Sequence, residues 1–344
     1  MIRIVNWLLT RRCNLQCEYC SIVKNYEGMP KEYPDMKHYI QNEMSTQTVI
    51  DGLKKFKAHN PDAFHIWYGG EPLLRKDLPD IINFCNAEDI HYTIISNNTP
   101  EIQPMIKRLF EKTGREIKGF SASIDPVLSY KDNDLDRVKK SRAGFESLRE
   151  MLHYVNDVVA EVTVMKENED KLYDLIQFLS AQGINSDITF VDIAKSPYYD
   201  FSNITDESLL VQKSQQLADQ LLKIIGDDNA NVHMKYDLIP AIYDILPSNM
   251  DCGIEKSLHN VSVDADGTIR LCLRIRGKFA PSMVTLKNLF TESYEINPIA
   301  HAAIKRDKKE LCKLCNHTCQ LMSQIIDERN LGPEDLVHLD RRSL

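Results

Sequence analysis

The sequence has 344 residues, of which 43% are hydrophobic and 27% charged, and its formal net charge at pH 7 is -8. This acidic balance disfavours nucleic acid as the main partner, because phosphate contacts need clustered lysine and arginine. No run of about 18 apolar residues occurs, and the N-terminus becomes charged too soon for a secretory signal. We therefore expect a cytoplasmic protein that does not cross a membrane, with two domains or one large α/β domain and an appendage.

Short β-rich runs alternate with amphipathic helical segments through the first part of the chain. The β-rich runs span residues 2–10, 64–68, 91–96, 117–124, 158–164 and 187–193. This alternation is typical of parallel βα units. Six units are too few for a full eight-stranded barrel, so we expect an α/β fold with a partial (βα)6 TIM-like barrel. Its chemistry would then lie at the C-terminal ends of the strands.

The rest of the chain is predicted to contain a helical linker and a small α+β domain. A helix is expected over residues 209–225, and "NVSVDADGTIRLC" predicts a β-hairpin that turns at Asp264 to Gly267. The predicted domains are a barrel core at 1–210, a helical linker at 211–250 and a cysteine-rich domain at 251–344.

The cysteines fall into two groups. The chain has nine, and in a protein without an export signal they are poor candidates for structural disulfides. The first group is Cys13, Cys17 and Cys20, and the second is Cys252, Cys272, Cys312, Cys315 and Cys319. Only Cys85 stands apart, and we expect it to be a buried helix residue. This clustering favours metal binding or catalysis.

The first group provides three thiols on one predicted loop. Zinc and iron-sulfur clusters both accept cysteine thiolates at such spacings, and both usually take four ligands. Three thiols leave one position open, as a catalytic zinc site also does, but here all three sulfurs come from one predicted loop. A structural zinc loop remains the alternative.

The spacing C-x3-C-x2-C, with Tyr19 before the last cysteine, resembles that of the radical SAM superfamily. The resemblance implies that Cys13, Cys17 and Cys20 hold three irons of a 4Fe-4S cluster. The fourth iron would bind the amino and carboxylate groups of S-adenosylmethionine (SAM). An electron from the cluster would cleave SAM, and the 5'-deoxyadenosyl radical would abstract a hydrogen atom from the substrate.

Further motifs support the resemblance. "WYGGEP" follows the second strand, where the superfamily has its SAM-binding glycine motif; the glycines allow a close backbone approach, and the glutamate offers an acceptor to an ammonium. By the same resemblance, contacts to SAM are expected from strand ends and from a helical cation. The expected SAM contacts are Tyr19, Gly69, Gly70, Glu71, Asn97, Ser123 and Arg142. Plain turns and a solvated helix charge are the alternatives for these positions.

The second cysteine group resembles the SPASM and twitch auxiliary-cluster domains of the same superfamily. Five thiols are too few for two further clusters, so the resemblance implies one auxiliary 4Fe-4S cluster for electron transfer. Its four ligands would come from Cys252, Cys272, Cys312, Cys315 and Cys319, and which of the five is left over stays open. A structural zinc site is the alternative.

These motifs indicate a reaction type and not a substrate. The resemblance implies an oxidoreductase that oxidises or rearranges a small molecule or a peptide, with a flavodoxin- or ferredoxin-type electron donor. Because the sequence starts at the first strand, we expect no fused leader-peptide domain. A ribosomal-peptide maturase (crosslinking or epimerisation) with separate leader recognition is one alternative, and a non-catalytic iron-sulfur or zinc binding module is another. RNA modification is a less favoured alternative, because the net charge of the chain is negative.

Overall fold

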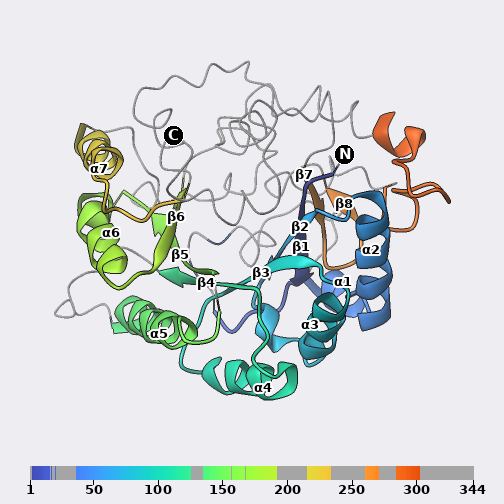
Figure 1. Cartoon of the computed structure of the whole chain (residues 1–344), viewed down its shortest axis with the longest axis horizontal. Helices are drawn as coiled ribbons and strands as arrows, with labels where there is room; N and C mark the ends of the chain where they lie inside the picture. The colour runs from blue at the N-terminus through green and yellow to red at the C-terminus, as the bar shows by residue number, and fades with distance from the viewer. Residues whose placement is uncertain are drawn as a thin grey trace. The chain divides into compact units, whose positions relative to one another are not determined.

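The computed structural model describes ten stretches of the chain, which divide into two compact units (Figure 1). The described residues are 2–15, 17, 20, 36–124, 135–155, 157–166, 168–191, 215–233, 260–270 and 284–302. The first unit comprises Met1–Tyr92, Ala194–Asn203 and Ser248–Pro333, and the second comprises Thr93–Ile193, Ile204–Pro247 and Glu334–Leu344.

The first unit is built on strand β1, which is buried along its whole length. Its strands are β1 (Ile4–Thr10), β2 (Phe64–Gly69), β7 (Asn260–Val263) and β8 (Ile269–Arg270). Its helices are α1 (Met36–Gln41), α2 (Thr46–His59), the 3-10 helix η1 (Pro72–Leu74) and α3 (Leu78–Ala87). Parallel partners flank β1 on both sides, β2 on one and β7 on the other, and β8 returns antiparallel to β7. A central parallel strand of this kind needs an apolar run, which "IVNWLLT" supplies.

The second unit continues the βα alternation. Strand β3 (His91–Ser96) starts in the first unit and ends in the second. It is followed by α4 (Gln103–Thr113), β4 (Gly119–Ile124), α5 (Leu135–Met151), β5 (Asp157–Val164), η2 (Glu169–Lys171), α6 (Leu172–Ala181), β6 (Asn185–Phe190) and α7 (Gln215–Gly226). Strand β4 pairs in parallel with β3 and β5, and β5 with β6. In Figure 1, α5 and α6 lie on the outer side of these strands.

The strand order β6-β5-β4-β3-β2-β1-β7-β8 confirms the predicted α/β class. All six predicted strands are present, and with β7 they give a parallel sheet of seven strands, which is consistent with the predicted partial barrel. The predicted helix at 209–225 corresponds to α7, which begins at Gln215; the six residues before Gln215 lie outside the described residues. None of the helices in the described ranges has the length and apolar composition that a membrane crossing requires.

The predicted hairpin is also present, but its place in the sheet was not foreseen. The amide of Asp264 donates to Thr268 O at 2.8 Å, and the amide of Gly267 donates to Asp264 O at 2.8 Å. The sequence assigned this hairpin to a separate domain at 251–344, whereas β7 pairs with β1 from Ile4↔Asn260 to Trp7↔Val263. The buried edge of β1 requires a backbone partner, and β7 provides it. The predicted domain boundaries themselves stay a prediction.

Candidate active site

The cysteine loop leaves β1 in a tight turn. The side-chain oxygen of Thr10 accepts a hydrogen bond from the amide of Arg12 at 3.1 Å. The amide of Leu15 donates to the sulfur of Cys13 at 3.4 Å, and the amide of Cys20 donates to Cys17 O at 3.1 Å. All three cysteines are partly exposed. The loop thus presents its thiols at the end of the strand and not inside the core, while Tyr19 lies outside the described residues.

The glycine motif holds the start of this loop by its backbone. The amide of Gly70 donates to Thr10 O, and the amide of Glu71 donates to Arg12 O, both at 2.8 Å. A Cβ on Gly70 would lie 2.2 Å from Arg12 O, and one on Gly69 would lie 2.2 Å from Thr10 O. Both glycines are therefore required by close contact with the cysteine loop, in addition to any approach to a ligand.

Glu71 lies beside the cysteine loop. Its side chain is fully buried, and one carboxylate oxygen accepts from the amide of Leu73 at 3.0 Å, which caps η1. It is close enough to Cys13 to raise the pKa of that thiol electrostatically. The structure thus brings the three cysteines, Gly69, Gly70 and Glu71 together at one edge of the sheet, because β1 and β2 are parallel and end there.

The protein alone keeps the Cys13 thiol protonated. Burial and, after it, the charges of Glu71, Cys20 and Cys17 together raise the pKa of Cys13 to about 11, whereas the Leu15 amide opposes the shift. A thiolate here requires a nearby positive charge, which none of the described side chains that act on Cys13 supplies, and bound iron is such a charge.

The donor set fits an iron-sulfur cluster better than a single ion. Among the described residues, no three Cys, His, Asp or Glu side chains converge to hold one metal ion. In a cluster each thiolate binds a different iron, so three cysteines on one loop need not meet at a point. The chemistry of three soft sulfur donors suits this group.

Two buried arginines that the sequence analysis did not single out fix the surroundings of the loop. Arg75 donates to Leu9 O at 2.9 Å and to Met44 O at 3.0 Å, and it pairs with Asp77 at 2.6 Å. Burial opposes ionisation of Asp77, but the hydrogen bonds from Arg75 and Thr46 keep the pKa of this carboxyl below its usual value.

The second arginine is Arg11, which forms a buried ion pair with Asp264 in the β7–β8 turn and lies over the ring of Tyr39. In the sequence, the arginine pair in "RRC" and the acidic turn "DADG" each indicate a charged group, but neither indicates that the two groups pair with each other.

The other predicted SAM contacts belong to the second unit. Asn97 is buried after β3 and accepts from the amide of Thr99 at 3.1 Å; Ser123 is partly exposed near the end of β4; Arg142 is exposed on α5. Their roles stay predictions.

The predicted auxiliary cysteines Cys252, Cys272, Cys312, Cys315 and Cys319 lie outside the described residues. Cys85 is buried in α3, as predicted.

The three cysteines follow the first strand of a parallel α/β sheet, and the glycine motif follows its second. This arrangement is typical of proteins that bind a metal cluster and a ligand where the strands end. Residues 7–179, which are half of the chain, match the family model described as "Radical SAM superfamily". The chain belongs to the radical SAM superfamily, and membership implies a 4Fe-4S cluster and SAM.

Among curated relatives, the human "Molybdenum cofactor biosynthesis protein 1" is 23% identical over 321 residues, covering 88% of this chain and 46% of the human protein. The "Radical SAM cyclopropyl synthase TigE" of Paramaledivibacter caminithermalis is 23% identical over 342 residues, covering 95% of this chain and 69% of that protein. The chain thus spans about half the length of the first of these relatives.

Among solved structures, the chain resembles Streptococcus suis SuiB bound to S-adenosylmethionine, with a TM-score of 0.56 and 14% identity over 97% of this chain and 75% of SuiB. SuiB bound to its precursor peptide SuiA gives a TM-score of 0.57, also at 14% identity, over 97% of this chain and 74% of SuiB. At this level of identity the likeness supports the fold and not the substrate.

Proposed function

We propose that the protein is a radical SAM enzyme that cleaves SAM reductively at a 4Fe-4S cluster held by Cys13, Cys17 and Cys20. The observation that carries the proposal is the backbone attachment of the cysteine loop to Gly70 and Glu71, each through a hydrogen bond of 2.8 Å. When bound, the cluster and SAM supply a 5'-deoxyadenosyl radical that abstracts hydrogen from the substrate. The chain's own residues hold the thiols in place and offer the Glu71 carboxylate beside them.

Contacts from Tyr19, Asn97, Ser123 and Arg142 complete the proposed SAM site. Asn97 and Ser123 support this role because each lies at the C-terminal end of its parallel strand, where ligands bind in such sheets. Arg142, exposed on α5, would provide a cation for the carboxylate of SAM.

We further propose an auxiliary 4Fe-4S cluster with four ligands from Cys252, Cys272, Cys312, Cys315 and Cys319, in a SPASM- or twitch-type domain. The β7–β8 hairpin that separates Cys252 from Cys272 supports this proposal, as does the likeness to SuiB over 97% of this chain. The corresponding domains are a core at 1–210, a linker at 211–250 and the auxiliary domain at 251–344. Electrons would come from a cytoplasmic flavodoxin or ferredoxin.

The substrate in this proposal is a small molecule or a peptide that is oxidised or rearranged. The peptide reading has specific support, since SuiB was solved with a precursor peptide. It is the basis of the second candidate function, a ribosomal-peptide maturase.

The test measures iron, sulfide and 5'-deoxyadenosine in anaerobically reconstituted protein. We expect about eight irons per chain, falling to about four in the Cys13/Cys17/Cys20→Ala triple variant, as two four-iron clusters require. Cys17→Ala should lose 5'-deoxyadenosine formation, whereas Cys85→Ala, the matched cysteine control in α3, should keep it. Retained SAM cleavage in Cys17→Ala, or zinc in place of iron, would refute the proposal and leave a non-catalytic binding module.

A further inference from the structure

The sheet of the second unit has one apolar and one polar face. In β4 and β5 the residues that alternate toward one side are apolar and buried, among them Ile124, Ala160 and Val162. Helix α5 covers this side, since a Cβ on its Gly144 would lie 3.5 Å from the side chain of Ile124. The opposite side carries mainly polar residues, with Ile95 and Val159 as apolar exceptions; it includes Thr93, Ser121, Ser123, Asp157, Glu161 and Asp187. Parallel sheets that only form a core are apolar on both faces.

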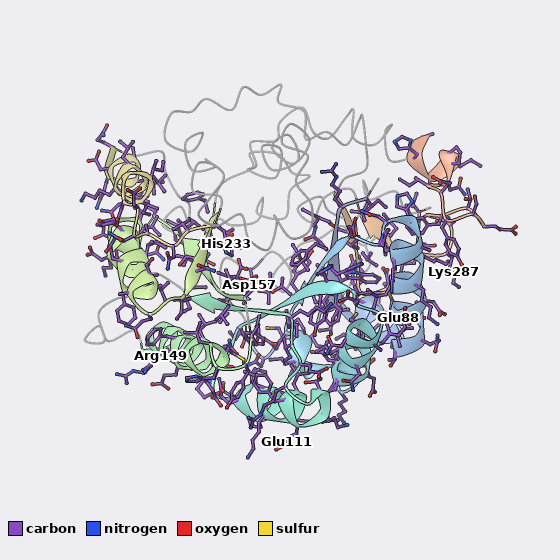
Figure 2. All side chains as sticks on the ribbon, viewed as in Figure 1. Glu88, Glu111, Arg149, Asp157, His233 and Lys287 are labelled. Atoms are coloured by element: carbon purple, nitrogen blue, oxygen red, sulfur yellow. The ribbon has the colours of Figure 1, made fainter. Side chains whose placement is uncertain are left out.

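Three of these polar residues form one row across neighbouring strands. The register pairs Ser123 with Glu161 and Glu161 with Asp187, so their side chains lie on the same face. His233, which follows α7, approaches Asp187 with its Nδ1 3.2 Å from Oδ1. Figure 2 shows Asp157 and His233 on the inner side of the strands, whereas Arg149 of α5 projects outward. Two carboxyl groups and an imidazole are therefore gathered opposite the helices.

Among the described residues, the charges that act on Glu161 are mainly negative. Burial and, after it, the neighbouring Asp187 and Asp157 together raise the pKa of Glu161 to about 8, while a hydrogen bond with Ser121 and the proximity of His233 oppose the shift. Glu161 therefore holds a proton near neutral pH. A cation placed beside it would lower this pKa and favour the ionised carboxylate.

A separate observation on the same face points to a ligand. The hydroxyl of Thr93 is buried, with the residue 8% exposed, and it has no hydrogen-bond partner among the described residues. The register Ile94↔Phe120 places Thr93 opposite Gly119, which in turn pairs with Asp157. Thr93, Gly119 and Asp157 thus occupy one row across three strands. Because Gly119 has no side chain, the strand next to Thr93 offers no side-chain partner to its hydroxyl. A buried hydroxyl without a partner is costly, and a polar group of a ligand is one way to complete it.

We propose that this polar face is part of the substrate site and that Glu161, Asp187 and His233 bind an alkylammonium group of the substrate, with Glu161 releasing its proton to solvent as the cation binds. The inference rests on the proposed function, because it assigns a substrate class to the same enzyme. The attraction of the ammonium to two adjacent carboxylates offsets their mutual repulsion. The Thr93 hydroxyl lies four residues earlier along its strand than the Glu161 row, in the row of Asp157, and would contact a polar part of the same ligand.

The test uses the reconstituted full chain with SAM and three small probes. N-acetyl-lysine amide represents a peptide ammonium, pentylamine represents a small-molecule amine, and N-acetyl-norleucine amide is the uncharged match of the first. Calorimetry at pH 7 in two buffers of different ionisation enthalpy gives both the affinity and the number of protons released. We expect a cationic probe to bind at millimolar concentration or better, at least about tenfold more tightly than the norleucine probe, with proton release.

Variants assign the effect to residues. Glu161→Gln should abolish the proton release and most of the preference for the cation, whereas Glu146→Gln, a matched change on the exposed side of α5, should preserve both. Asp187→Asn provides a second variant: it removes a negative neighbour of Glu161, so fewer protons should be released per ligand at pH 7.

The outcomes separate the possibilities. Tighter binding of the lysine probe than of pentylamine assigns the cation to a peptide, the reverse assigns it to a small molecule, and either result supports the site. Equal binding of lysine and norleucine probes, no binding of either cation, or an unchanged preference in Glu161→Gln overturns the inference. Because this readout needs no turnover, a failure of SAM cleavage would count against the proposed function alone.

Discussion

Arg11 and Asp264 form a buried ion pair across 253 residues of sequence, with Nε 2.9 Å from Oδ1 and Nη2 2.6 Å from Oδ2. The guanidinium carbon also lies 4.0 Å from the centre of the Tyr39 ring. Arg11 precedes Cys13 by two residues, and Asp264 lies in the β7–β8 turn, so the pair fastens the late hairpin to the start of the cysteine loop. The two-pronged geometry is the strongest that an arginine and a carboxylate make.

Removal of one partner of this pair should destabilise the protein strongly. Asp264→Ala leaves the Arg11 charge buried and uncompensated, which should cost about 3–5 kcal/mol of unfolding free energy. Urea denaturation measures the loss. The control is Glu88→Ala, which breaks the exposed Lys57–Glu88 pair and should cost about 0–1 kcal/mol. Equal losses of unfolding free energy in the two variants would show that the buried pair stabilises the protein no more than the exposed pair does.

Gly70→Ala should displace the cysteine loop. The new Cβ would lie 2.2 Å from Arg12 O, and a backbone oxygen cannot move aside as a flexible side chain does. We expect lower iron content after reconstitution and a lower melting temperature. Gly226→Ala is the matched control, since nothing lies within 4 Å of its Cβ, and its stability should stay within about 0.5 kcal/mol of the wild type. Wild-type iron content in Gly70→Ala would contradict the proposed packing.

The stability of the protein should fall with rising pH through the titration of Glu161. Its pKa is about 8 in the folded state against an ordinary value of 4.5, so the folded state binds this proton more tightly than the unfolded state. The resulting stabilisation is complete below pH 4.5 and is lost as the pH rises to 8. Glu161→Gln should therefore flatten the melting temperature over this window, whereas Glu146→Gln should follow the wild type. Parallel curves for wild type and Glu161→Gln would exclude this titration.

Acid should destabilise the protein through His65. This side chain is buried and its Nδ1 accepts from Trp7 Nε1 at 2.9 Å, and burial lowers its pKa to about 3, with His91 adding to the effect. Below pH 6.5 the unfolded state binds a proton at His65 that the folded state does not bind. The free energy of unfolding is therefore highest above pH 6.5 and decreases as the pH falls toward 3.

His65→Leu should weaken this acid dependence while it costs about 1–3 kcal/mol at pH 7.5, because the Trp7 N–H loses its acceptor. Urea unfolding at pH 7.5 and pH 5 checks both effects. The exposed His153→Leu serves as control and should change neither value by more than about 0.5 kcal/mol. An undiminished acid loss in His65→Leu would assign the effect to other groups.

The sequence predicts the strands and the cysteine loop well because both depend on local patterns. The apolar runs before Cys13 and before Gly69 end where the structure ends β1 and β2, within a residue. The Arg11–Asp264 pair depends on a contact across 253 residues, which no local pattern encodes. Glu161 escaped notice for a related reason: "VVAEVTV" indicates a strand, but the carboxyl group acquires its properties only from Asp187 on the next strand and His233 beyond α7.

The pairing of β1 with β7 has a consequence for synthesis of the chain on the ribosome. Ile4 pairs with Asn260, so 256 further residues must be synthesised before this edge of β1 has its partner strand. At about 5–20 residues per second, that interval lasts roughly 13–50 s. Throughout it the nascent chain carries an apolar strand with one open edge, which is a template for pairing with other chains. Slower growth of the culture and added chaperones should therefore raise the yield of soluble protein.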